Sequence, residues 1–145
     1  MRQQVDTRQL NTYASVGCPA QVLVVDRPGG PAHVLMDTVS LLAEREVSIT
    51  FVEDHVDAQR ALDFYVFDLV VVGLEVQHLD QVVVLRELTA LDPRLKVMVV
   101  GREMPHFYRR KAYQHGARQV LDVPQRAADL KALVWHMTHC YLRVA

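Results

Sequence analysis

Cysteine and net charge are both scarce in this chain of 145 residues. Its two cysteines, Cys18 and Cys140, lie near opposite ends and form neither a CxxC pair nor a metal-binding spacing. This pattern favours two free thiols in a reduced, cytoplasmic protein. The formal net charge is −1, so bulk charge gives no reason to expect nucleic acid or an acidic membrane surface as a partner.

Long hydrophobic runs and targeting segments are also missing. The first ten residues, MRQQVDTRQL, lack the apolar core of a signal peptide, and no apolar run is long enough to span a bilayer. Residues 1–17 are polar and lack strong periodicity, so we expect a flexible N-terminal arm followed by a single domain over residues 18–145. Half of the residues are hydrophobic, which suffices for a buried core at this length.

Recognisable catalytic motifs are absent as well. The chain has no convincing catalytic triad, no paired catalytic carboxylates and no redox motif. The stretch RPGGP, residues 27–31, is neither a GxGxxG motif nor a P-loop, and its two prolines remove amide donors from any anion-binding turn. In HMTHC, residues 136–140, a spacing of three can place two ligands on one helical face, but no third or fourth ligand is visible, which favours a structural role. We expect no enzyme activity, no metal and no cofactor.

Short apolar runs alternate with amphipathic segments along the chain. The predicted strands cover residues 21–26, 48–52, 68–72, 96–101 and 118–123. The predicted helices cover residues 32–46, 54–65, 79–93, 105–116 and 125–144. The strands are rich in β-branched residues and lack in/out alternation, which is typical of a parallel sheet covered on both faces. Right-handed crossovers then favour a doubly wound α/β sheet, either flavodoxin-like or Rossmann-like.

Helical spacing also predicts buried faces. In residues 32–46 the spacing picks out a stripe that contains Val34, Leu35, Thr38, Leu41, Leu42 and Arg45. In residues 54–65 the expected inner face contains Val56, Ala61, Leu62 and Tyr65. In the last helix an apolar stripe that includes Leu130, Val134 and Met137 is widened by Trp135, and this surplus indicates a dimer or partner face.

Four stretches, VLVVD, DLVVV, LTALDPRLKVMVV and GARQVLDVP, resemble those of a response-regulator receiver domain of the chemotaxis-receiver type. The resemblance covers residues 20–145 and implies a five-stranded parallel sheet of order 2-1-3-4-5 with five helices. In such receivers two acidic residues after the first strand hold Mg²⁺, and an aspartate after the third strand takes a phosphoryl group. A Thr or Ser after the fourth strand senses that group, and a Lys before a Pro after the fifth strand pairs with it.

This sequence departs from the receiver pattern at most of those positions. Asp26 matches the first acidic residue, and Pro124 matches the proline. The departures are Arg27 for the second acidic residue, Gly73 for the phosphoacceptor, Gly101 for the Thr or Ser, and Val123 for the lysine. The resemblance therefore implies a degenerate pseudo-receiver that lacks the phosphoacceptor aspartate. Its expected function is a phosphorylation-independent regulatory module that acts by protein contact in signal transduction or transcriptional regulation.

Two further functions remain open. Gly73 and Gly101 are expected at neighbouring strand ends, where they would leave a hollow lined by Arg27 and Arg102. A small anionic ligand could bind there, although Arg27 could instead pair with Asp26 or with a carboxylate of residues 53–54. An enzyme on a flavodoxin-like fold is the third and least favoured reading.

The last third of the chain carries the predicted contact surface. The stretch HFYRRKAY, residues 106–113, places aromatic side chains beside a basic cluster, which fits a protein contact better than nucleic acid at this net charge. We expect a protein partner or a homodimer through the helices at residues 105–116 and 125–144. The predicted partner face consists of Tyr108, Arg109, Arg110, Tyr113, Trp135 and Tyr141.

Overall fold

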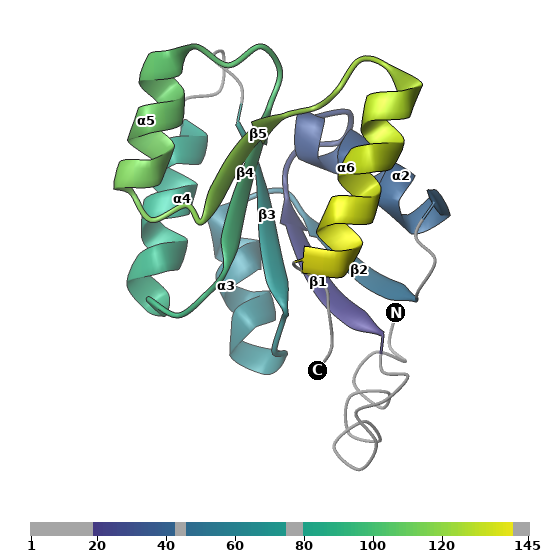
Figure 1. Cartoon of the computed structure of the whole chain (residues 1–145). Helices are drawn as coiled ribbons and strands as arrows, with labels where there is room; N and C mark the ends of the chain where they lie inside the picture. Colours follow the sequence, from purple (N-terminus) through teal and green to yellow (C-terminus); the bar gives the residue numbers. More distant parts are fainter. Residues whose placement is uncertain (1–18, 43–45, 75–79, 141–145) are drawn as a thin grey trace.

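The computed structural model describes residues 19–42, 46–74 and 80–140. Within these ranges five parallel strands form one sheet of order β2-β1-β3-β4-β5, and five helices surround it (Figure 1). The strands are β1 (Ala20–Val25), β2 (Val47–Val52), β3 (Leu69–Leu74), β4 (Val97–Gly101) and β5 (Gln119–Asp122). The helices are α2 (Pro31–Leu42), α3 (His55–Phe64), α4 (Asp80–Leu91), α5 (His106–Gln114) and α6 (Ala127–Cys140). The predicted strand order and the predicted flavodoxin-like architecture are confirmed.

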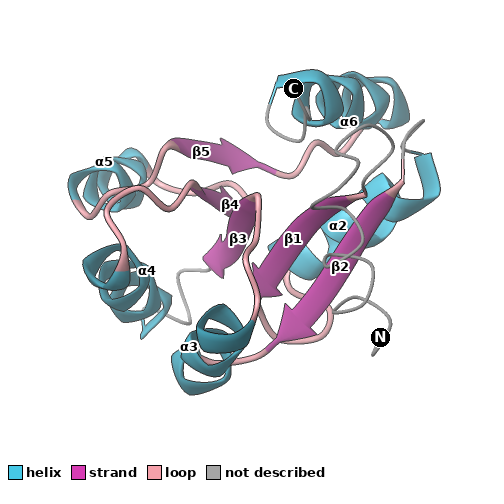
Figure 2. Cartoon of the chain, turned by 90° about the horizontal axis from the view of Figure 1, so that it is seen from below, coloured by secondary structure: helices cyan, strands magenta, loops and turns pink. Residues whose placement is uncertain are grey.

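The helices cover the sheet on both faces. Helices α2 and α6 pack on one face, and α3, α4 and α5 pack on the other (Figure 2). The three central strands are buried along their whole length, whereas the edge strands β2 and β5 are mostly half-buried. Full burial explains why β1, β3 and β4 are continuous apolar runs, since neither face of these strands meets water.

Strand β3 extends further than its sequence indicates. The predicted strand stops at Val72, but the structure continues the ladder through Gly73 and Leu74. Gly73 pairs with Val100, and Leu74 pairs with Gly101. Gly73, which was expected just after its strand, therefore lies inside the ladder, whereas Gly101 ends β4 as predicted.

The buried face of α2 differs from the predicted stripe. The buried residues are Pro31, Ala32, Leu35, Met36 and Val39. Val34 is exposed, and the side chain of Leu41 is 83% exposed, so among the described residues of the predicted stripe only Leu35 is buried. Arg45, the last residue of that stripe, lies outside the described residues. The error is one of helical phase, because the run of apolar residues in α2 is dense enough to fit two adjacent faces.

In α3 the prediction is wrong for one residue. Val56 is 49% exposed, and Ala58 takes the buried position on that turn. Ala61, Leu62 and Tyr65 pack against the core as predicted. Asp54 begins the helix by accepting a hydrogen bond from the backbone N–H of Asp57 at 2.9 Å, which is the ordinary N-cap arrangement.

Some predictions fall outside the described part of the chain. These are the arm at residues 1–17, Cys18 and Tyr141. The side chains of His139 and Cys140 are likewise outside it. In α6 the described part fits the predicted stripe, with Val134 and Met137 buried and Leu130 half-buried against the core.

Candidate functional site at the strand ends

The carboxyl ends of β1, β3, β4 and β5 meet along one edge of the sheet, where open α/β sheets bind ligands. Asp26 directly follows β1, and its backbone N–H donates to the carbonyl of Val52 at 3.0 Å. Its side chain is 4% exposed and lies against Gly73 of the neighbouring strand. The fold therefore brings together Asp26 and Gly73, two positions that the sequence analysis singled out.

The carboxylate of Asp26 is held by backbone donors. Oδ1 accepts from the N–H of Arg27 at 2.8 Å, and Oδ2 accepts from the N–H groups of Ala32 at 2.9 Å and His33 at 3.2 Å. Ala32 and His33 lie in the first turn of α2, whose amides lack partners within the helix. Asp26 therefore satisfies both the turn after β1 and the start of α2.

The hollow expected beside Gly73 and Gly101 is filled. A Cβ atom added to Gly73 would overlap the carboxylate of Asp26. A Cβ atom added to Gly101 would overlap the terminal methyl group of Met104 and would lie 3.0 Å from the carbonyl oxygen of Leu74. The space directly beside each of the two glycines is thus occupied by a neighbouring side chain.

The two arginines expected around that hollow lie at its outer rim. The side chains of Arg27 and Arg102 are exposed, and the guanidinium of Arg102 donates to the carbonyl of Gly29 at 3.0 Å. This contact joins the end of β4 to the turn that precedes α2. Arg102 therefore acts as a strap between two loops of the site, a role that no short motif in the sequence indicates.

A cavity of about 540 Å³ opens beside the filled site. It is lined by Arg102, Glu103, Asp122, Val123, Pro124 and Gln125. The side-chain amide of Gln125 donates to Glu103 at 3.3 Å, and Asp122 accepts from the backbone N–H of Met104 at 3.2 Å. Val123 and Pro124, which stand where receiver domains have a Lys and a Pro, therefore line a polar opening.

Comparison with known proteins identifies the family. The response regulator receiver domain family matches residues 22–135, which is most of the chain. The chain belongs to this family. No sequence among curated proteins matches the chain.

Solved structures of receiver domains share the fold. The phosphorylated cyanobacterial phytochrome response regulator RcpA has a TM-score of 0.69 at 16% identity, covering 88% of this chain and 96% of its own. RPA3017, a response regulator in red light signalling of R. palustris, has a TM-score of 0.65 at 19% identity, covering 87% and 98%. HP1043, an orphan response regulator of H. pylori, has a TM-score of 0.64 at 19% identity, covering 86% and 97%. At these identities the likeness concerns the fold alone.

The Mg²⁺ ion that a receiver fold implies does not fit the residues present. A hard divalent cation requires several oxygen ligands, yet the oxygens of Asp26 already face three N–H donors. Neighbouring Arg27 and Gly73 offer no carboxylate. Among the described residues no group of three or more His, Cys, Asp or Glu side chains is placed to hold a metal ion.

The predicted partner face of this receiver domain lies on two helices with β5 between them (Figure 2). On α5, Tyr108 is half-buried against the core and Arg110 is exposed. On α6, the side chain of Trp135 is 58% exposed. Phe107, which the sequence analysis did not select, is 60% exposed, and the ammonium of Lys111 lies 5.6 Å from the centre of its ring.

Two residues of that predicted face bond to the domain itself. Arg109 donates to the carbonyl of Val120 at 3.3 Å, and it lies 3.5 Å from the carboxylate of Asp122. The hydroxyl of Tyr113 accepts from the backbone N–H of Val120 at 3.1 Å. Arg109 and Tyr113 therefore attach α5 to the edge strand β5, whatever else they contact.

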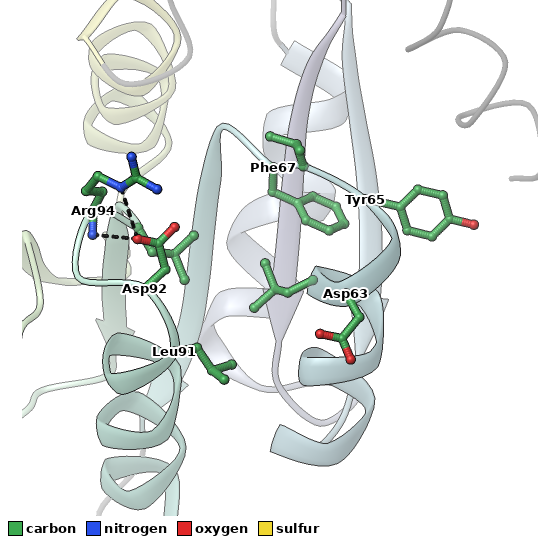
Figure 3. Close-up of a pocket in the computed structure, with 9 residues that line it drawn as sticks. Asp63, Tyr65, Phe67, Leu91, Asp92 and Arg94 are labelled. Carbon is green, nitrogen blue, oxygen red and sulfur yellow. Dashed lines mark hydrogen bonds and ion pairs between the residues drawn. The ribbon is translucent and has the colours of Figure 1, made fainter.

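A second cavity, of about 330 Å³, lies at the opposite end of the sheet, between the ends of α3 and α4. It is lined by Leu62, Asp63, Tyr65, Val66, Phe67, Leu91, Asp92, Arg94 and Leu95. The carboxylate of Asp92 accepts from the backbone N–H of Arg94 at 3.0 Å (Figure 3). The rings of Tyr65 and Phe67 lie edge to face, with their centroids 6.4 Å apart. The N–H of Arg94 lowers the pKa of Asp92 below the ordinary carboxyl value of 3.8. The sequence analysis did not predict this cavity.

Described helices offer no route across a bilayer, since none combines the necessary length and apolar character. Receiver domains are generally regulatory modules of signal transduction without catalytic activity of their own, and they typically interact with other proteins.

Proposed function

We propose that this receiver domain regulates a partner by protein contact and does so without phosphorylation. The observation that carries the proposal is the place of the Asp26 carboxylate, which fills the space beside Gly73. By the receiver resemblance, that space is where the phosphoacceptor side chain would stand. A phosphoryl group there would also meet a buried negative charge, and such a pair of anions is unfavourable in a site of low dielectric.

The fold alone does not decide between the two modes of action. RcpA is described as phosphorylated and shares the fold of this chain. The difference must therefore come from individual residues at the strand ends. Arg27, Gly73, Gly101 and Val123 all depart from the receiver pattern, while the hydrophobic frame around them is kept.

The contact surface proposed for output is the exposed part of α5 and α6. Trp135 and Phe107 are large side chains that remain mostly in solvent, and the exposed Arg110 follows Phe107 by three residues on α5. Aromatic residues and arginine are enriched in protein interfaces. The filled strand ends leave surfaces such as this one as the available route for regulation.

Phosphorylation chemistry gives the direct test. The purified protein is incubated with Mg²⁺ and either acetyl phosphate or beryllofluoride, and is then examined by intact mass and by NMR. We expect no stoichiometric acyl phosphate and no Mg²⁺-dependent shift of the amides of Asp26 and Gly73. The variant Asp26→Asn is the matched control, because it removes the carboxylate at the site without changing its size. Stoichiometric modification that disappears in Asp26→Asn would refute the proposal.

A further inference from the structure

The N-terminus of α2 is an anion-binding arrangement whose anion belongs to the protein. The first turn of the 12-residue helix contains no acidic side chain, so its amides have no local carboxylate. Ala32 and His33 instead donate to Asp26, which lies six and seven residues earlier in the chain. The helix dipole favours a negative charge at this end, and the three amide bonds offset the cost of burying it.

Two glycines enclose the same carboxylate. A Cβ atom added to Gly30, in the turn, would overlap it, and so would a Cβ atom added to Gly73, in β3. Gly30 also closes the turn by donating to the carbonyl of Arg27 at 3.0 Å. The carboxylate, on the residue that follows β1, therefore touches the α2 turn and β3 at once, and neither glycine could carry a side chain while Asp26 stays in place.

We propose that the Asp26 carboxylate is a tethered anion that locks the loop between β1 and α2 against β3. We call this three-residue arrangement, Asp26 with Gly30 and Gly73, the carboxylate latch. It keeps small external anions out of the strand ends by occupying their donors. It also holds the loop in one conformation. The latch concerns the same strand ends as the proposed function but does not depend on it, because its test needs neither a phosphoryl donor nor a partner.

The first test removes the tether and supplies the anion separately. In Asp26→Gly the three amides lose their acceptor, and we expect the midpoint of thermal unfolding to fall by roughly 10 °C. Sodium formate should recover a saturable part of that loss, whereas sodium chloride at the same ionic strength should not. The matched control is Asp54→Gly, which removes the exposed N-cap aspartate of α3. Formate should stabilise neither this control nor the wild type beyond the effect of chloride.

The second test measures the coupling between residues 26 and 73. In the wild type, Gly73→Ala should lower the unfolding midpoint by roughly 10 °C, because its Cβ would overlap the carboxylate. In the Asp26→Gly background Gly73→Ala should lower the unfolding midpoint by only a small part of that amount. Equal costs in the two backgrounds would overturn the latch, as would formate stabilisation that is equal in Asp26→Gly and Asp54→Gly.

A measurement on the unmodified chain covers the case in which Asp26→Gly does not fold. The buried bonds predict that the amides of Ala32 and His33 exchange with solvent far more slowly than the amide of Asp57, whose partner Asp54 is exposed. Recovery of folding by formate would support the latch. Exchange of Ala32 and His33 as fast as that of Asp57 would refute it.

Discussion

The hydroxyl of Tyr113, on α5, accepts a hydrogen bond from the backbone N–H of Val120, on the edge strand β5. Arg109, one helical turn earlier, donates to the carbonyl of the same residue. An unpaired backbone at a sheet edge is a template for association with another strand. These two side chains therefore occupy both backbone groups of Val120 and reduce the capacity of β5 to pair with another chain.

This relationship makes Tyr113→Phe informative. The substitution keeps the ring and removes the acceptor, so the N–H of Val120 loses its bond to the Tyr113 hydroxyl and the domain should lose about 1 kcal/mol of unfolding free energy. The thermal midpoint should then fall by roughly 4 °C, and amide exchange at Val120 should become faster. Tyr108→Phe is the control, because its hydroxyl makes no hydrogen bond within the described residues. Equal behaviour of the two variants would show that the bond to Val120 contributes nothing.

Alanine substitutions at Gly116 and Gly29 distinguish the cost of backbone strain from the cost of a steric overlap. Both have a positive φ, of 105° and 83°, which disfavours any residue with a Cβ atom. A Cβ atom at Gly116 would also lie 2.8 Å from Cγ2 of Thr89, whereas nothing lies within 4 Å of one at Gly29. We expect Gly29→Ala to cost about 1 kcal/mol and Gly116→Ala about 2–3 kcal/mol, as measured by chemical denaturation.

The smaller variant Thr89→Ser provides the control for Gly116. It removes Cγ2 but keeps the hydroxyl that donates to the carbonyl of His115 at 2.9 Å. In this background Gly116→Ala should lower the unfolding free energy by less than it does in the wild type, because Cβ of residue 89, at 3.1 Å, is then the nearest atom. If the cost stays the same, the Thr89 contact is not its cause.

Asp92 should give a pH dependence of defined sign. Its pKa in the folded protein is lowered, chiefly by the backbone N–H of Arg94, so its charged form stabilises the fold. The contribution is fully present above the ordinary carboxyl pKa of 3.8 and is lost as the pH falls through the lowered value. The thermal midpoint of wild type should therefore exceed that of Asp92→Asn near neutral pH, and the gap should close in acid.

The control for Asp92 lies in the same pocket. Asp63→Asn also removes one negative charge from the lining, but Asp63 makes no hydrogen bond within the described residues. Subtracting its effect from that of Asp92→Asn isolates the contacts with Arg94. A gap that widens in acid would show that the sign of the linkage is wrong.

The sheet could be predicted from sequence because its cause is local. β1, β3 and β4 are buried on both faces, so the sequence of each is an almost continuous run of apolar residues. The phase of α2 could not be fixed in the same way. Leu41 and Val34 fit a helical stripe, yet the sheet is met by Leu35, Met36 and Val39. Which apolar face is buried depends on how the helix packs on the sheet. The sequence of the helix alone does not determine that orientation.

The strand-end site shows the same limit. Asp26, Gly73 and Gly101 lie at the sheet's carboxyl edge. The approximate ends of the strands can be read from sequence. Which side chains occupy the space around these residues could not be predicted. That the Asp26 carboxylate lies against Gly73 depends on a contact across 47 positions, and Met104 reaches Gly101 through a loop whose conformation has no sequence signature.

The predicted partner face needs a test that leaves the fold intact. Arg109 is unsuitable, since it bonds to Val120 and lies close to Asp122, and its loss would weaken β5. Arg110 and Trp135 are exposed, so Arg110→Glu and Trp135→Glu should each change the unfolding free energy by only about 0.5 kcal/mol. Circular dichroism checks that each variant folds.

Under the proposed function both exposed variants should weaken self-association or partner binding by at least roughly tenfold, because a charge reversal or a buried glutamate at an interface is costly. Light scattering across a concentration series measures the first, and titration with a partner isolated on the wild-type chain measures the second. Phe64→Glu is the matched control, since Phe64 is a 75% exposed aromatic residue at the end of α3, away from α5 and α6. A wild type that stays monomeric, together with variants that keep every partner, would exclude this face. Loss of binding in Phe64→Glu alone would show that the contact surface lies at the end of α3.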